Sequence, residues 1–133
     1  MCLPKRLKEM QKRTGDRGED IAARFLSGKG FEIAARNYHS RFGEIDIIAV
    51  NDKYIVFAEV KTRNINSFGT GAEYVGPDKQ IRIIKTAFQY LNKYKTDLQP
   101  RFDVIEIEYD CVTSALVNIR HIENAFDGAG DII

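Results

Sequence analysis

Apolar residues recur along the chain with two different periods, and this separates the expected helices from the expected strands. Between Asp16 and Gly30 the spacing is that of an amphipathic helix, which Gly28 and Gly30 end. Asp16 is a candidate N-cap, and Glu19 follows three residues later, as in a capping box. Residues 1–13 are basic and lack a full apolar stripe, so we expect a flexible arm or a short helix there.

Shorter apolar runs, bounded by turn residues, predict strands in the rest of the chain. A second helix is expected from Pro77, with Asp78 near its positive end, after a polar, glycine-rich loop at residues 64–76. Its expected buried stripe consists of Ile81, Ile84, Ala87, Phe88 and Leu91. The predicted strands are residues 31–38, 43–50, 54–62, 102–109 and 115–122, and residues 125–133 are expected to be a fraying tail.

The resulting order is helix, three strands, helix, two strands, over 133 residues that suit a single domain. One mixed sheet of about five strands with helices packed on it is the natural layered solution, so the fold class is α/β. A hydrophobic fraction of 44% and a charged fraction of 29% are ordinary for a globular protein.

Charge is unevenly distributed along the chain, although the net charge is only +1. Residues 61–96 contain seven Lys and Arg against two acids, whereas residues 97–133 contain eight acids against two Arg. Such segregation permits a positive face for a polyanion, although charge runs are more often plain solvated faces. Cys2 and Cys111 lie far apart, and no apolar run suits a signal peptide or a membrane span, so we expect a cytoplasmic protein with no membrane partner.

The segment GEIDIIAVNDKYIVFAEVKTR, residues 43–63, has acidic residues inside two otherwise apolar strands. A buried carboxylate needs a partner, a metal or a wet cleft, because an unpaired one is destabilising by several kcal/mol as an order of magnitude. Strand alternation puts Glu59 and Lys61 on one face. A two-residue turn at either Asn51-Asp52 or Asp52-Lys53 would add Asp46 to that face, whereas a three-residue turn would not.

Two neighbouring carboxylates suit Mg²⁺ or Mn²⁺, which can stabilise a phosphodiester and lower the pKa of an attacking water. An ammonium two residues along the strand could position that water or neutralise developing charge. A structural interpretation stays open for each residue. Glu59 and Lys61 could form an ordinary ion pair, and Asp46 could bond backbone amides.

Asp46 followed by Glu59-Val60-Lys61 resembles the PD-(D/E)xK nuclease motif. The wider sequence, from about Gly15 to Ile107, resembles the YraN-like family of small bacterial proteins through GDRGEDIAARFLSGKGFEIAARNY, FGEIDIIA, FAEVKTR, DKQIRIIKTAFQYL and RFDVIEI. That family is considered similar to Holliday-junction resolvases with a restriction-endonuclease-like, three-layer fold. Ile45 departs from the superfamily pattern, in which many members have proline, but this changes the turn rather than the chemistry.

The resemblance implies metal binding by Asp46 and Glu59, with Lys61 as the catalytic lysine. It adds Glu19 as a catalytic residue and metal ligand, although a capping-box glutamate is an equal alternative. Asp103 also matches the family, but a structural role with Arg101 or the backbone is favoured. The residues assigned to nucleic-acid binding are Arg17, Arg63, Lys79, Arg82 and Lys85, and for Lys79 a solvated lysine is the alternative.

These patterns predict a metal-dependent DNA endonuclease that hydrolyses phosphodiesters, with branched DNA as one substrate. The alternative is a nucleic-acid-binding module with a nuclease-like fold and no turnover, acting with a recombination or DNA-uptake partner. A purely structural domain would require the three site residues to be ion-paired and shielded. A homodimer would suit symmetric branched DNA.

Overall fold

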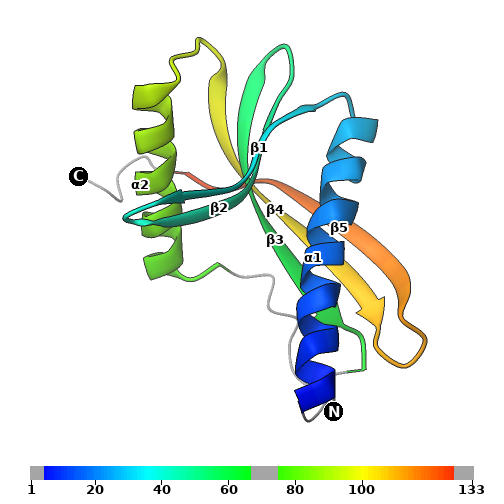
Figure 1. The fold of residues 1–133 in the computed structure, drawn as a ribbon. Coiled ribbons are helices and arrows are strands. Elements are labelled where there is room, and N and C mark those ends of the chain that lie inside the picture. The colour runs from blue at the N-terminus through cyan, green and yellow to red at the C-terminus, as the bar shows by residue number, and fades with distance from the viewer. Residues whose placement is uncertain (1–4, 67–74, 128–133) are drawn as a thin grey trace.

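The computed structural model describes residues 5–66 and 75–127, and the side chains from residue 17 onward. Two helices and five strands follow the expected order. Figure 1 shows α1 and α2 on opposite sides of the sheet, giving three layers. The elements are α1 (Lys5–Gly28), β1 (Glu32–Ser40), β2 (Gly43–Val50), β3 (Tyr54–Asn64), α2 (Pro77–Lys93), β4 (Gln99–Asp110) and β5 (Ala115–Phe126).

The sheet order is β1-β2-β3-β4-β5, so spatial neighbours are also neighbours along the chain. Among the described strands, β3 and β4 alone pair in parallel, and α2 lies in the connection between them. A parallel pair needs such a crossover because the chain must return to the same end of the sheet. The predicted α/β class with a mixed five-stranded sheet is confirmed, and the arrangement is consistent with a three-layer nuclease-like fold.

Helix α1 begins well before the predicted start, at Lys5. Asp16 lies inside the helix, so it is not the N-cap and the capping-box interpretation of Glu19 is wrong. The end of the helix was predicted correctly. Gly30 has φ +95°, and the amide of Phe31 donates to the carbonyl of Leu26, which closes the helix as a Schellman motif.

The turn between β2 and β3 consists of Asp52 and Lys53, one of the two predicted possibilities. The amide of Asn51 donates to the carbonyl of Tyr54 at 3.0 Å. The side chain of Asn51 in turn accepts from the amides of Lys53 and Tyr54 at 2.9 and 2.7 Å. This Asx-type closure fixes the hairpin register, in which Val50 lies opposite Ile55.

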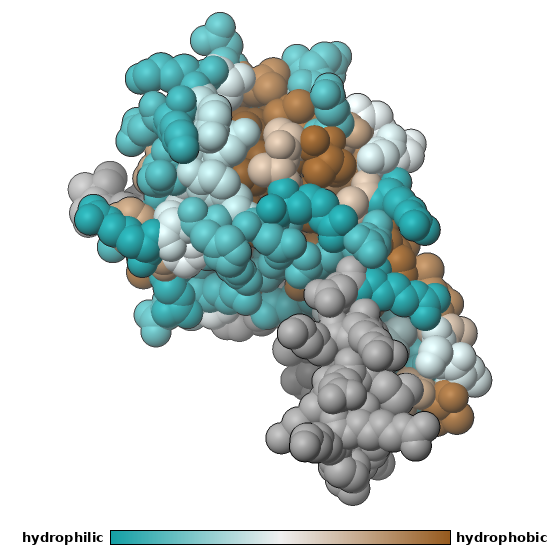
Figure 2. All heavy atoms as spheres, in the orientation of Figure 1, coloured by the Kyte–Doolittle hydropathy of each residue, from teal (hydrophilic) through white to brown (hydrophobic). Residues whose placement is uncertain are grey.

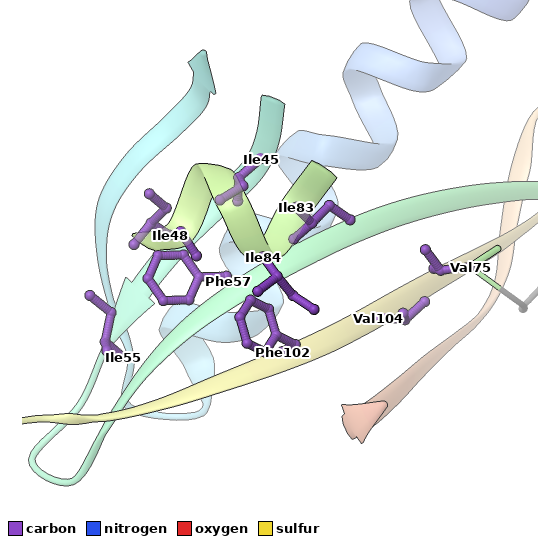
Figure 3. Close-up of a cluster of buried hydrophobic side chains, with 10 residues drawn as sticks. Ile45, Ile48, Ile55, Phe57, Val75, Ile83, Ile84, Phe102 and Val104 are labelled. Atoms are coloured by element: carbon purple, nitrogen blue, oxygen red, sulfur yellow. The ribbon is translucent and has the colours of Figure 1, made fainter. Parts of the chain in front are cut away.

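Each face of the sheet has its own apolar cluster beneath one helix. On the α1 face, Ala22 and Leu26 pack against strand residues such as Val56. On the α2 face, Phe57 and Phe102 stack with ring centroids 5.6 Å apart beneath α2 (Figure 3). Burial of aromatic and branched side chains on both faces supplies most of the favourable free energy of folding.

The predicted buried stripe of α2 is partly wrong. Ile84 and Ala87 are buried as expected, but Ile83 is buried where Ile81 was predicted, and Phe88 is 49% exposed. The amide of Gln80 donates to the carbonyl of Gly76 across Pro77, which confirms the predicted helix start. The predicted glycine-rich loop falls largely on residues 67–74, outside the described residues.

Candidate metal and phosphate site

Two buried carboxylates face each other where the β2–β3 ladder ends. The observed pairs Ile48 with Phe57 and Ile47 with Ala58 place Asp46 opposite Glu59 at the next step. Both side chains belong to residues that are only 7% exposed. The register on which the site depends is therefore the one that the sequence required.

Different groups hold the two carboxylates of this pair. Asp46 Oδ2 accepts the backbone amide of Val60 at 2.8 Å, in the position where the strand ladder would otherwise continue. Glu59 Oε2 lies 3.1 Å from Lys79 Nζ, which reaches it from the first turn of α2. Asp46 thus fulfils the structural role left open by the sequence, and it still presents its side chain to Glu59.

The surroundings of the Asp46–Glu59 pair favour the binding of a proton or a cation. Burial, followed by the hydrogen bond and the negative charge of Asp46, raises the pKa of Glu59 from 4.5 to about 8, and Lys79 only partly opposes this. Near neutral pH the metal-free pair therefore retains a proton that an isolated glutamate would have lost. A divalent cation between the two groups would replace that proton.

Lys61 lies two residues after Glu59 on the same face and is half-buried. Within the described part of the chain it forms no ion pair, so the predicted Glu59–Lys61 pair does not occur there. Its register partner on β4 is Glu106, which is fully buried. Glu106 Oε1 accepts from Arg120 at 3.1 Å, whereas its Oε2 has no hydrogen-bond partner among the described residues.

Sequence reasoning missed Glu106. Its signal was an acid within the apolar strand run FDVIEI, the same signal that identified Asp46 and Glu59.

Glu19 belongs to the helix on the opposite face of the sheet (Figure 1). Its carboxylate lies 3.9 Å from Arg36, whose guanidinium also pairs with Asp20 at 2.8 Å. Nowhere in residues 17–66 and 75–127 do three acids, histidines or cysteines form a group able to hold a metal. The structure therefore brings together Asp46 and Glu59 but does not add Glu19 to them.

Three of the five predicted nucleic-acid contacts lie on α2. We call Arg41, Lys79, Arg82 and Lys85 the basic cluster. Arg41 and Lys85 approach the Phe42 ring at 4.9 and 5.6 Å, and Arg82 packs over Gly43. The cluster therefore spans α2 and the β1–β2 turn. Figure 2 shows mainly hydrophilic residues over the left side of the molecule, where α2 lies in Figure 1.

The other two predicted contacts, Arg63 and Arg17, lie apart from this cluster. Arg63 pairs with Glu108 at 2.7 Å, and Arg17 donates to the carbonyl of Ser114. Arg41 was missed by sequence reasoning because the HSRFG turn offered no periodic pattern that would place it beside α2.

Asp103 forms a separate network between β4 and β5, as favoured from the sequence. Arg101 donates to both of its oxygens at 2.9 and 2.8 Å, and the Asn124 amide adds a bond of 3.0 Å. Burial alone would raise the pKa of Asp103, but hydrogen bonds from His121, Arg101 and Asn124 hold it below its usual value.

His121, which showed no partner in the sequence, lies 2.7 Å from Asp103 and 2.8 Å from Lys29. This buried histidine is therefore part of the Asp103 network. His39, by contrast, is exposed and lies 3.2 Å from Glu44.

Comparison with known proteins places this chain in a family. The family model described as uncharacterised protein family UPF0102 matches residues 18–107. The chain belongs to the UPF0102 family. This confirms the resemblance to the YraN-like proteins, and the matched range includes Asp46, Glu59, Lys61 and Lys79.

UPF0102 proteins of several bacteria are similar over most of their length. A relative from Caldanaerobacter subterraneus is 43% identical over 123 residues, covering 90% of this chain and all of the relative. One from Alkaliphilus oremlandii is 43% identical over 120 residues, with 88% and 100% covered. One from Clostridium perfringens is 41% identical over 121 residues, with 90% and 98% covered.

Neither α1 nor α2, as far as the structure describes them, combines the length and the apolar character that crossing a membrane requires.

Proposed function

We propose that this UPF0102 protein is a metal-dependent endonuclease that hydrolyses phosphodiesters in DNA. The observation that supports it best is the buried pair of Asp46 and Glu59, close enough to share a hydrogen bond, on the same face as Lys61, which forms no ion pair with any described residue. A structural ion-pair network would explain Glu59 and Lys79. It would not explain Lys61, which finds no carboxylate partner within the described residues.

The donor set fits Mg²⁺ or Mn²⁺. Magnesium typically takes one or two protein carboxylates and completes its coordination with waters and substrate phosphates. Asp46 and Glu59 would hold the ion, and the raised pKa of Glu59 marks the same concentration of negative charge. When bound, such an ion neutralises charge on the phosphodiester and makes a water molecule more acidic.

The protein's own side chains account for the other requirements of the reaction. Lys61 projects from the face that bears Glu59, where its ammonium can neutralise negative charge that develops on the phosphate. The basic cluster, whose Lys79 contacts Glu59, can contact phosphates along the DNA strand, which would position the scissile bond. Symmetric branched DNA as a substrate would favour a two-fold dimer, which stays a prediction.

The second candidate is a DNA-binding module without nuclease activity. The ion pair between Lys79 and Glu59 is the observation that favours it. The Lys79 ammonium already neutralises part of the carboxylate pair, and the basic cluster would bind phosphate without any metal. If this candidate is correct, the protein should slow the migration of DNA in a gel without cleaving it.

Cleavage assays with branched, nicked and linear DNA plus Mg²⁺ test the proposal. We expect cleavage by the wild type and at least about a hundredfold loss in Asp46→Asn, because one metal ligand is removed. Asp52→Asn, the same change at the exposed turn of the same hairpin, should keep wild-type activity.

Equal cleavage by the wild type and Asp46→Asn would indicate a contaminating nuclease. If none of the proteins cuts and all of them shift DNA with a steep dependence on salt, the binding module is correct.

A further inference from the structure

Lys79 holds its ammonium against the carboxylate pair of Asp46 and Glu59, where a metal ion would also bind. Its Nζ lies 3.1 Å from Glu59 Oε2. Among the described residues, no other cationic side chain forms an ion pair with Asp46 or Glu59. The two side chains differ in how freely they can move, because that of Glu59 is 7% exposed whereas that of Lys79 is 43% exposed. The carboxylate is therefore fixed, and the ammonium can leave.

An ammonium and a divalent ion compete for the same oxygen. Like charges a few ångströms apart repel, and a divalent ion attracts two carboxylates more strongly than a single ammonium does. The lysine side chain has four rotatable carbon–carbon bonds and strong hydration, so it can reorient into solvent at little energetic loss. Lys79 also lies in the first turn of α2, three residues before the exposed Arg82 of the basic cluster.

We propose that Lys79 is a resident counter-cation that a divalent metal displaces from Glu59, and that the released ammonium then contacts a phosphate of the DNA. This inference rests on the metal site of the proposed function and assigns Lys79 a role in its regulation. In the metal-free protein the ammonium of Lys79 neutralises the one negative charge that remains on the proton-sharing carboxylate pair. In the metal-bound protein it strengthens the basic cluster beside the site.

One consequence is a coupling between metal and DNA. Each ligand would favour the arrangement in which Lys79 has left Glu59, so each would tighten the binding of the other. Removal of the lysine should weaken this coupling, because the metal would no longer change the number of phosphate contacts.

Metal binding without DNA tests the exchange directly. We would titrate Mn²⁺ into the wild type, Lys79→Gln, Lys79→Arg and Lys93→Gln, and follow binding by calorimetry and by the paramagnetic resonance of free Mn²⁺. Lys93→Gln is a matched control, because it removes the same charge from an exposed position of the same helix that lies outside the basic cluster and does not contact Glu59.

We expect Lys79→Gln to bind Mn²⁺ about threefold to tenfold more tightly than the wild type, since a competing ion pair is removed. Lys93→Gln and the charge-preserving Lys79→Arg should stay within about twofold of the wild type. With Ca²⁺ as a divalent ion, duplex DNA should bind to Lys79→Gln with a smaller metal-dependent gain in affinity than to the wild type.

The outcomes separate this inference from the proposed function. Saturable Mn²⁺ binding with equal or weaker affinity in Lys79→Gln overturns the exchange and leaves the metal site intact. Absence of saturable binding in the wild type overturns both. Thermal unfolding of each variant confirms that the compared proteins are folded.

Discussion

The metal-free protein is expected to lose stability as the pH rises from about 5 to about 8. The pKa of Glu59 is 4.5 in an ordinary environment and about 8 in the folded protein, because burial and Asp46 disfavour its charged form. Between these values the folded state binds a proton that the unfolded state has released. The free energy of unfolding therefore falls, by at most about 1.4 kcal/mol per pH unit from this group.

Glu59→Gln should remove this part of the pH dependence. An amide at position 59 is neutral at every pH in the range and can donate to Asp46 as the protonated carboxyl does. The variant should resemble the wild type near pH 5, and near pH 8 it should be more stable by a few kcal/mol as an order of magnitude. Urea unfolding at several pH values, with metal removed by a chelator, measures the difference.

Glu32→Gln is the matched control for this series, because Glu32 is exposed on β1. Its pH profile should run parallel to that of the wild type. A Glu59→Gln profile that is also parallel would show that Glu59 titrates normally in the folded protein.

Asp103→Ala is expected to destabilise the protein by about 3–5 kcal/mol. The substitution removes the acceptor of Arg101, His121 and the Asn124 amide. The side chains of Arg101 and His121 are only 11% and 3% exposed, so water cannot easily replace the carboxylate. Chemical denaturation gives the change in free energy of unfolding.

Glu123→Ala provides the comparison for Asp103→Ala. Glu123 contacts the same guanidinium at 3.6 Å, but its side chain is 56% exposed. Its removal should change stability by less than about 1 kcal/mol. Similar losses in both variants would show that the burial of Asp103 is not what gives the network its importance.

The β2–β3 hairpin could be predicted from sequence because its determinants are local. Asn51 closes the turn through its own side chain, and strand alternation then assigns faces to Asp46, Glu59 and Lys61. The acids in apolar strands were visible as exceptions to the pattern. This is why the carboxylate pair was found without any knowledge of its neighbours.

Helix boundaries and faces were less predictable. The basic residues at the start of α1 show no apolar stripe, so nothing in the pattern distinguished a helix from an arm there. In α2, Ile81 and Ile83 are both apolar and two residues apart, and only docking onto the sheet selects Ile83 for burial. Phe88 fitted the stripe by spacing but stays half exposed.

Contacts between distant segments were beyond a single sequence. Lys79 meets Glu59 only because α2 returns across the face of the sheet, and His121 meets Asp103 only because β5 pairs with β4. Neither partner is implied by spacing along the chain. The contacts of Lys79 and His121 could therefore be identified only from the fold.

Strand order has a consequence for how the protein is made. Since the sheet order follows the chain from β1 to β5, each strand leaves the ribosome after its neighbour in the sheet, with α2 between β3 and β4, and a nascent sheet can grow at one edge. Strands β1 to β3 already form an antiparallel meander that contains Asp46 and Glu59. The two carboxylates are thus synthesised before α2, which carries Lys79, so water can solvate them until the helix covers this face of the sheet.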